Sequence, residues 1–195
     1  MNIIERPSPN FNKGRGGKKI VGIVLHGTDG DFPGCLTWLT NPAAKASAHY
    51  LIDRPGPIYR LVKEEDTAWH CRGYNETTIG IELVCQVTAG QDYTDEQYDS
   101  LNALLADIRT RQSNPWIKPH SELDPERRHD PGPKFDWPRI LAIDPPAAAE
   151  EPSPWADDAW WWSDHNNLMD GNPHGVVTRE MLAVVLFRFK EVKHD

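Results

Sequence analysis

The chain has 195 residues, with 29 acidic and 21 basic side chains and a formal net charge of -8. This length allows one domain of ordinary size with a hydrophobic core and a small appendage. The acidic balance argues against a nucleic-acid partner, because phosphate binding depends on clustered Lys and Arg. The three cysteines, Cys35, Cys71 and Cys85, are odd in number and lack metal-ligand spacing, which predicts free thiols in a reducing cytoplasm.

The N-terminal segment, Met1 to Phe11, is polar and contains two prolines. It lacks the apolar core of a signal peptide, and no run in the chain approaches the roughly 18 apolar residues of a membrane span. A flexible, basic stretch follows, from Asn12 to Lys19. We therefore expect a cytoplasmic protein without membrane insertion.

Four segments have the composition of β-strands. Ile20 to Leu25 is short, apolar and β-branched, as in a strand buried on both faces, and it ends directly at His26. Segments 47–54 and 57–62 predict a hairpin, because Arg-Pro-Gly-Pro between them supplies turn residues. With Thr78 to Val84 as the fourth strand, these segments predict a sheet.

A helix is predicted after Thr94, which forms a capping box with Gln97. Apolar residues then recur at helical spacing: Tyr98, Leu101, Leu105 and Ile108. Residues 114–136 are rich in Pro, Gly and charge and predict a long loop, and long loops in compact domains are usually functional. Residues 143–154 read as a semi-rigid linker, which places a domain boundary near residue 145.

Three residues have the types and positions expected of zinc ligands. A zinc hydrolase needs about three protein ligands and an open position, where the metal lowers the pKa of water from about 16 to about 7. His26 emerges at the end of a strand, although a lone histidine is more often structural. His120 and Asp130 share the long loop, and Asp130 opens a stiff Asp-Pro-Gly-Pro sequence that can fix a carboxylate.

Five segments in order, LHGT, SAHYLIDRPGPIYRLV, TAWHCRGYN, TIGIELV and HSELDPERRHDPGPKFDW, resemble successive motifs of the zinc N-acetylmuramoyl-L-alanine amidases. That family is related to the peptidoglycan recognition proteins. The resemblance covers roughly residues 18–142, and the combination is far more specific than any single motif. It implies an α/β fold with a mixed central β-sheet flanked by helices, and hydrolysis of the bond between muramic acid and L-alanine in peptidoglycan.

The resemblance makes His26, His120 and Asp130 the zinc ligands. His129 is the competing third ligand, but the family places its ligand directly before Pro-Gly-Pro, where Asp130 stands. The same resemblance makes Glu82 the general base, since a glutamate after Ile-Gly-Ile fills that role in one branch. Judged from its own sequence context alone, without the resemblance, Glu82 could equally be a strand-edge carboxylate facing water.

Two further positions, Ala48 and Arg128, indicate which branch of the family the chain resembles and which residue would stabilise the negatively charged oxygen of the reacting amide. Some relatives use a tyrosine base before the histidine of the second strand, and that position is Ala48 here, in keeping with a glutamate base. Arg128 stands where the family usually has a lysine that stabilises the oxyanion. Arginine keeps the charge in a bulkier, planar group, and its alternative role is that of a solvated loop cation.

Five more residues are candidates for substrate binding: His49, Trp69, His70, Tyr74 and Asn75. His70 is expected to meet substrate or to orient a zinc ligand. His49 alternates with its neighbours in a strand and could equally be a satisfied inward-facing histidine. Trp69, Tyr74 and Asn75 suit a groove for peptide and sugar.

The domains predicted are a catalytic domain over 1–145, a Pro/Ala/Glu linker over 146–154 and a helical hairpin over 155–195. The hairpin resembles the short helical repeat at the ends of some phage lysins and, more distantly, an S-layer homology motif. It could bind the cell wall, join two copies into a homodimer through Trp160 to Trp162, or cover apolar surface of the catalytic domain.

Three functions follow. The first is a phage or prophage endolysin that acts on the cell wall after release by a separate holin-type protein. The second is a cytosolic amidase that recycles soluble muropeptides, which gives no use for a wall-binding tail. The third is a non-catalytic peptidoglycan-binding module; such relatives typically lack a zinc ligand, whereas all three are present here.

Overall fold

The computed structural model describes residues 2–141. The chain divides into two units, Met1–Ile143 and Asp144–Asp195, and the described residues belong to the first. The predicted linker over 146–154 and the predicted helical hairpin over 155–195 lie outside them. Within the described range, every helix is too short or too polar to cross a membrane.

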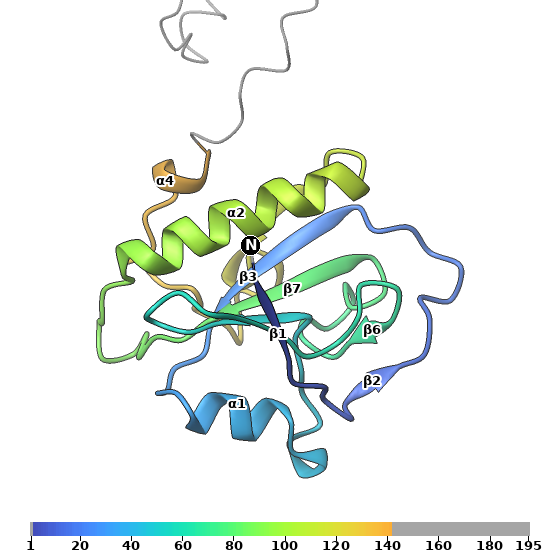
Figure 1. The fold of residues 1–195 in the computed structure, drawn as a ribbon, viewed down its shortest axis with the longest axis horizontal. Coiled ribbons are helices and arrows are strands. Elements are labelled where there is room, and N and C mark those ends of the chain that lie inside the picture. The colour runs from blue at the N-terminus through green and yellow to red at the C-terminus, as the bar shows by residue number, and fades with distance from the viewer. Residues whose placement is uncertain (1, 142–195) are drawn as a thin grey trace, which may run out of the picture. The chain divides into compact units, whose positions relative to one another are not determined.

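The centre of the fold is a six-stranded mixed sheet (Figure 1). Its strands, in spatial order, are β1 (Ile3–Glu5), β5 (Ile58–Arg60), β4 (Tyr50–Ile52), β7 (Thr78–Leu83), β3 (Gly22–Gly27) and β8 (Trp116–Pro119). Neighbouring strands are parallel except β4 and β5, which form the predicted antiparallel hairpin. A separate two-stranded sheet pairs β2 (Phe11–Asn12) with β6 (Thr67–Ala68).

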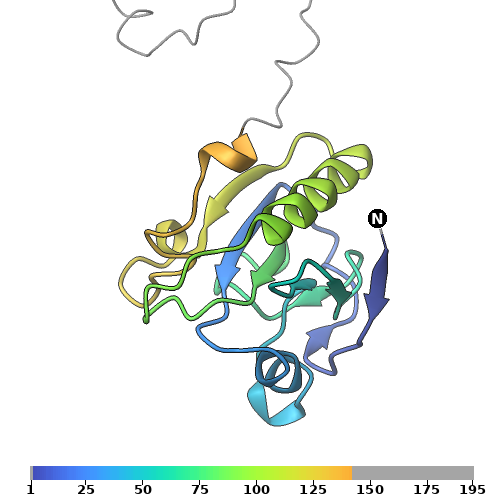
Figure 2. The same ribbon diagram turned by 60° about the vertical axis from the view of Figure 1, so that its left-hand side comes forward.

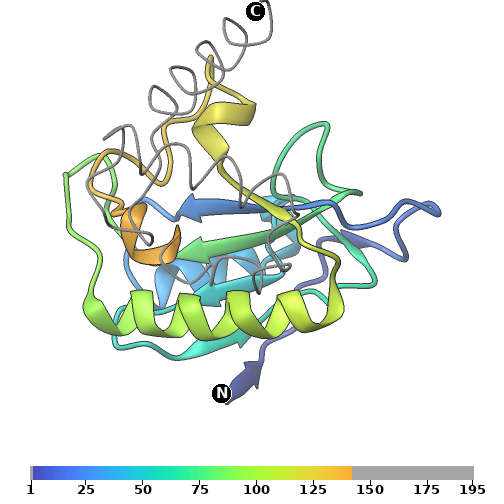
Figure 3. The same cartoon turned by 90° about the horizontal axis from the view of Figure 1, so that it is seen from above.

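Helices cover both faces of the large sheet. The long helix α2 (Asp95–Arg111) lies on one face and α1 (Gly34–Leu39) on the other (Figures 1 and 3). Three short helical turns complete the described unit: η1 (Pro42–Ala44), α3 (His120–Leu123) and α4 (Pro138–Leu141). The α/β fold with a mixed, helix-flanked sheet is thus confirmed.

Successive side chains of β7 point alternately toward the hydrophobic core and toward the site. Ile79, Ile81 and Leu83 pack under α2 in the main hydrophobic core, with exposed fractions of 0%. Because successive strand residues point to opposite faces, Glu82 lies on the face away from α2. In the parallel register between β3 and β7, His26 stands beside Glu82. The two polar side chains therefore share one face of the sheet.

The predicted start of α2 is confirmed in detail. The Thr94 hydroxyl accepts from the backbone N–H of Gln97, and the Gln97 side chain accepts from the N–H of Thr94. Such a cap typically contributes about 1 kcal/mol. Gln97 also donates to the Val84 carbonyl at the end of the sheet, so the capping residue fixes the helix against the strands.

The prediction of one long loop over 114–136 was wrong for its first part. Residues 116–119 form β8, which extends the sheet beside β3, and α3 follows at once (Figure 2). The strand has only four residues, ends in proline and is half-buried. Its sequence therefore does not show the apolar run from which a buried strand is predicted. His120 consequently begins a helix at a strand end.

The N-terminal segments are also more ordered than expected. Residues 3–5 form β1, parallel to β5. Arg15, in the stretch predicted to be flexible, is 8% exposed and donates to the carbonyl oxygens of Glu76 and Thr78. Its many backbone contacts explain how a basic segment becomes fixed.

Candidate active site

The site is a cleft of about 850 Å³ at the carboxyl ends of the parallel strands. His26 lies near the end of β3, Glu82 near the end of β7, and His120 directly after β8. Parallel strands deliver such side chains to a common edge, where α/β sheets usually bind ligands. The topology thus assembles residues that are far apart in the chain.

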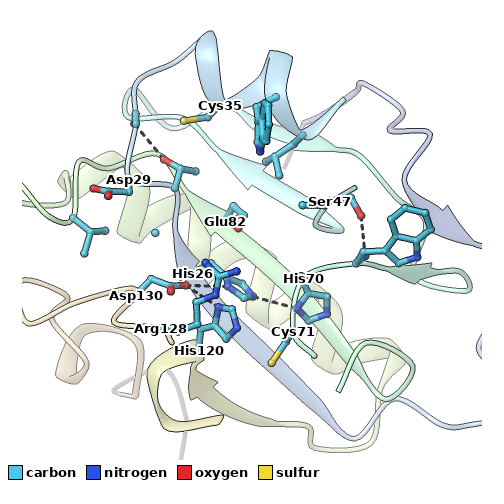
Figure 4. A pocket seen from close by; sticks show the side chains of 18 of the residues that line it. His26, Asp29, Cys35, Ser47, His70, Cys71, Glu82, His120, Arg128 and Asp130 are labelled. Atoms are coloured by element: carbon cyan, nitrogen blue, oxygen red, sulfur yellow. Dashed lines mark hydrogen bonds and ion pairs between the residues drawn. The ribbon is translucent and has the colours of Figure 1, made fainter. Parts of the chain in front are cut away.

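His26, His120 and Asp130 form one cluster of possible ligand atoms (Figure 4). The Oδ2 atom of Asp130 lies 3.0 Å from Nδ1 of His26 and 3.1 Å from Nδ1 of His120. Zinc bonds of 2.0–2.1 Å in a tetrahedral site imply separations of about 3.3 Å between ligand atoms. The spacing therefore fits zinc, and the adjacent His129 is not part of the cluster.

A chain of hydrogen bonds assigns the proton positions on His26 and His70. The Thr78 hydroxyl donates to the Tyr74 carbonyl at 2.7 Å, so its oxygen can accept from Nε2 of His70 at 3.3 Å. Nδ1 of His70 is then free to accept from Nε2 of His26 at 3.1 Å. The lone pair on Nδ1 of His26 consequently faces Asp130.

A lone pair facing a carboxylate at 3.0 Å is repulsive unless a proton or a cation lies between them. Burial lowers the pKa of His26 despite the neighbouring Asp130, which disfavours the protonated ring. Although burial raises the pKa of Asp130, its close contacts with the His120 and His26 rings outweigh burial and hold that pKa well below its usual value. A divalent cation fits this arrangement of an ionised carboxylate and neutral imidazoles.

Glu82 is a buried carboxyl group with an unsatisfied oxygen in the described part of the chain. Its Oε2 atom is buried and accepts no hydrogen bond within the described residues. Burial raises the pKa of Glu82 to about 8, the nearby Asp130 adds to the rise, and Arg128 opposes it. A carboxyl group with a pKa near neutrality is suited to proton transfer, and its unsatisfied oxygen leaves room for a water or substrate atom.

Arg128 lies on the exposed loop across the cleft from Glu82 (Figure 4). Its charge is close enough to affect the pKa values of both His26 and Glu82. The neighbouring Arg127 is instead bound to Asp124, with its Nε donating to Oδ1 at 3.1 Å. Within the described range, Arg128 is therefore the loop arginine free to meet a ligand.

The sequence profile of N-acetylmuramoyl-L-alanine amidases matches residues 16–133, which is more than half of the chain. The chain belongs to the N-acetylmuramoyl-L-alanine amidase family. It is 37% identical over 119 residues to the 1,6-anhydro-N-acetylmuramyl-L-alanine amidase AmpD of Citrobacter freundii, covering 55% of this chain and 62% of that protein.

Two solved structures resemble the amidase closely. A selenomethionine derivative of AmpD has a TM-score of 0.64 and 30% identity, covering 72% of this chain and 93% of that one. AmiD from E. coli, in complex with anhydro-N-acetylmuramic acid-L-Ala-D-gamma-Glu-L-Lys, has a TM-score of 0.57 and 31% identity, covering 64% and 57%. The fold of the catalytic unit is therefore that of the family.

Three of the candidate substrate residues line the cleft of the amidase: Trp69, His70 and Asn75. The Oδ1 atom of Asn75 accepts from the backbone N–H groups of His70 and Cys71, at 2.9 and 2.7 Å. The His70 ring covers Gly80, where a Cβ atom would lie 2.4 Å from the ring. Asn75 and Gly80 thus fix the position of His70 beside His26.

The other two candidates do not line the cleft. His49 is fully buried; its Nδ1 accepts from the N–H of Gly80 at 2.9 Å, and its Nε2 lies 2.8 Å from Nη2 of Arg15 and 3.2 Å from the Asp66 carbonyl. Burial, reinforced by the charge of Arg15, lowers the pKa of His49 to about 3. Tyr74 packs edge-on against Trp116. The structure therefore favours the satisfied inward histidine, one of the two alternatives for His49.

Sequence reasoning missed three exposed or half-buried groups that line the same cleft: Trp38, Lys45 and Arg72. Trp38, on α1, is 57% exposed. The helix α1 has only six residues and no side-chain cap, so it is too short to show helical periodicity in the sequence. A lone tryptophan in an unassigned segment gave no reason to place it at the site.

The hydrogen-bond chain through His70 leads to a first prediction. Replacing Thr78 by Val removes the acceptor for Nε2 of His70, which stands directly behind the candidate ligand His26. We expect the affinity of the His26, His120 and Asp130 cluster for added zinc to fall by up to about tenfold, the lower end of the range for groups behind a metal ligand. Thr77 is the matched control, because its hydroxyl also donates to the Tyr74 carbonyl, at 3.3 Å, but does not contact His70. Chelator competition measures both affinities, and equal values for the two variants would contradict the role of Thr78.

Proposed function

We propose that the protein is a zinc-dependent N-acetylmuramoyl-L-alanine amidase that cleaves the amide bond between N-acetylmuramic acid and L-alanine of the stem peptide. The observation that carries the proposal is the cluster of His26, His120 and Asp130 beside the unpartnered carboxylate of Glu82. The AmiD complex contains a ligand with this linkage, which supports the substrate class. All three candidate ligands are present, in contrast to a non-catalytic binding module.

In the proposed mechanism, His26, His120 and Asp130 hold the metal. Bound zinc would lower the pKa of a water and polarise the amide carbonyl. Glu82 accepts the proton of the attacking water and delivers it to the departing amide nitrogen. Its raised pKa of about 8 in the metal-free chain makes it able to hold that proton transiently, and a nearby cation lowers the value toward the ionised form.

Arg128 stabilises the negative charge that develops on the amide oxygen in this mechanism. Replacing it by Ala lowers kcat about a hundredfold, the cost of losing one oxyanion donor, and Arg128→Lys restores part of it because the charge returns. Arg127→Ala is the control, since Arg127 is bound to Asp124. Steady-state kinetics of the three variants test the role, and unchanged turnover in Arg128→Ala would remove Arg128 from the mechanism.

The proposed reaction is tested by mass analysis of peptidoglycan digests. Purified protein should release free stem peptides beginning with L-alanine and leave intact glycan strands. Adding chelator should stop release, and zinc should restore it. Cleavage within the glycan or within the stem peptide, or a digest unaffected by chelator, would overturn the proposal.

Two cellular roles are consistent with this chemistry. We propose an endolysin, made in the cytoplasm and acting on the wall after holin-type release, on the resemblance of segment 155–195 to lysin repeats. The AmpD relative, which this chain matches over 62% of its length, supports instead the recycling of soluble muropeptides. Homodimerisation through Trp160 to Trp162 is a separate proposal.

Deleting residues 146–195 separates the two roles. An endolysin should lose activity on intact walls while keeping its activity on soluble muropeptides. A recycling enzyme should keep both rates. Sedimentation of the full chain and of the truncated chain tests homodimerisation in the same samples.

A further inference from the structure

One wall of the cleft is formed by residues outside the cluster of His26, His120 and Asp130. Its residues, called the outer wall, are Trp38, Leu39, Lys45, Ala46, Ser47 and Trp69. Figure 4 shows Ser47 across the cleft from Asp130 and His120. The wall combines two tryptophans with one cation, a composition suited to a sugar ring and a polar peptide. If the proposed reaction occurs at the metal, this wall holds the part of the glycopeptide that extends away from the broken bond.

The outer wall is fixed by the N-terminal arm, residues 8–12. This arm lies before residue 16, where the match to the family begins. The Ser8 hydroxyl donates to the carbonyl of Leu39 at the end of α1. The side-chain amide of Asn10 donates to the carbonyls of Asn41 and Ala46, at 2.8 and 2.9 Å. One buried amide thereby closes the loop that carries Lys45.

The arm also reaches Trp69 by two routes. The Ser47 hydroxyl donates to the Asn10 carbonyl at 2.6 Å and accepts from the backbone N–H of Trp69 at 2.9 Å. The indole N–H of Trp69 donates to Oδ1 of Asn12 at 3.2 Å. The pairing of β2 with β6, in which Asn12 stands opposite Thr67, holds this contact in place. Both the backbone and the ring of Trp69 are thus oriented by the arm.

Burial distinguishes the contacts of Ser8, Asn10 and Ser47 from incidental surface bonds, whereas the bond between Asn12 and the Trp69 indole is exposed. Ser8 and Asn10 are each 3% exposed and Ser47 is 1% exposed. Their polar groups are satisfied by this one network, and leaving such groups unpaired is costly. None of residues 8–12 lines the cleft. The arm can therefore influence substrate only through the outer wall.

We propose that residues 8–12 position the outer wall for glycopeptide binding, with Asn10 setting the loop before Ser47 and Asn12 setting the ring of Trp69. The inference rests on the proposed function for the identity of the ligand. The arm contributes to substrate affinity, while the metal cluster and Glu82 carry out the chemistry. Variants in the arm should therefore change KM and leave kcat and zinc content nearly unchanged.

The sharpest test is a double-mutant cycle between Asn12 and Trp69. Asn12→Ala should raise KM about three- to tenfold, the usual worth of one hydrogen bond, with kcat within about twofold. Trp69→Phe lacks the indole N–H, so adding Asn12→Ala to it should have no further effect. The same KM increase in both backgrounds, or no increase in either, would overturn the role of Asn12.

Asn10→Ala tests the loop, with Asn102→Ala as its matched control. Asn102, on α2, also donates its side-chain amide to a backbone carbonyl, that of Arg139 at 3.2 Å, but lies on the other face of the sheet. Both variants should be less stable, and only Asn10→Ala should raise KM. A KM change of equal size in both variants, or in neither, would contradict the proposal for Asn10.

A binding measurement keeps the inference separate from the proposed function. Calorimetry with N-acetylmuramoyl-L-alanyl-D-isoglutamine is carried out on the Glu82→Gln variant, with and without Asn12→Ala. A wild-type protein that releases no stem peptide would contradict the amidase proposal. The inference would then still be supported by a weaker dissociation constant in the Asn12→Ala variant, and contradicted by an equal one.

Discussion

Replacing Glu82 by Gln should lower kcat by about 10²- to 10⁴-fold, the usual contribution of a general base, while zinc content stays at the wild-type value. Glutamine keeps the shape of the side chain but cannot accept the proton. Because Glu82 is not part of the ligand cluster, metal affinity is largely retained. Muropeptide turnover and metal analysis of the same preparation measure the two quantities.

Glu126→Gln is the matched control, because Glu126 is an exposed carboxylate on the loop between His120 and Asp130. It should keep wild-type turnover. If Glu82→Gln also retained turnover, another group would have to act as the base. If Glu82→Gln lost its zinc, the fall in rate would report the metal rather than proton transfer.

The same substitution should change the pH dependence of stability in the metal-free protein. The pKa of Glu82 is raised from 4.5 to about 8, chiefly by burial. Between these values the unfolded chain releases a proton that the folded chain keeps, so wild-type stability falls as pH rises. The Glu82→Gln variant has no carboxyl group at this position, so its stability does not fall with pH for this reason. Its Tm relative to wild type should therefore increase from pH 4.5 to pH 8 and level off above it, whereas a constant difference would contradict the burial of this carboxyl.

The parts of the fold that the sequence predicted are those with strong local patterns. The strand β3 contains an apolar run that ends at His26, and β7 has apolar residues at alternate positions. The hairpin of β4 and β5 has its turn at Gly56, whose φ of 101° suits glycine. The helix α2 has its capping box and apolar spacing. In each case the pattern of a few neighbouring residues is enough to predict the element.

The elements that the sequence missed depend on partners distant in the chain. The strand β8 forms because β3 offers a free edge, since its own Trp-Ile-Lys-Pro sequence is too short to specify a strand. The N-terminal arm is polar, and its order comes from hydrogen-bond partners some 30 to 60 residues away, the Asn41 carbonyl and the Trp69 indole N–H. Local composition cannot reveal such pairings.

In the candidate site, too, some features follow from local sequence and others depend on residues distant in the chain. His26, His120, Asp130 and Glu82 were proposed from residue type and motif, yet their approach depends on a strand order that no local pattern states. The parallel register that puts Glu82 beside His26 is a property of the whole sheet. Trp38 and Lys45 were missed because their place at the cleft depends on α1 and on the N-terminal arm.

The second large effect is expected at Asp130, the proposed third metal ligand. Asp130→Ala should lower zinc affinity by more than about a hundredfold, beyond the range for groups behind a ligand, and amidase activity should be lost at micromolar zinc. The Asp130 carboxylate lies 3.0 and 3.1 Å from the two histidine nitrogens, and its ionised form balances part of the metal charge. Asp130→Asn keeps the shape without the charge and should also bind zinc weakly.

His129→Ala provides the control within the same loop, because His129 is the neighbouring residue that could compete as a ligand. Its side chain is exposed and stands outside the cluster formed by His26, His120 and Asp130. The variant should therefore keep wild-type zinc stoichiometry and turnover. Loss of zinc in His129→Ala together with retention in Asp130→Ala would exchange the two assignments. Equal losses in both variants would mean that the conformation of the loop, rather than one carboxylate, determines metal binding.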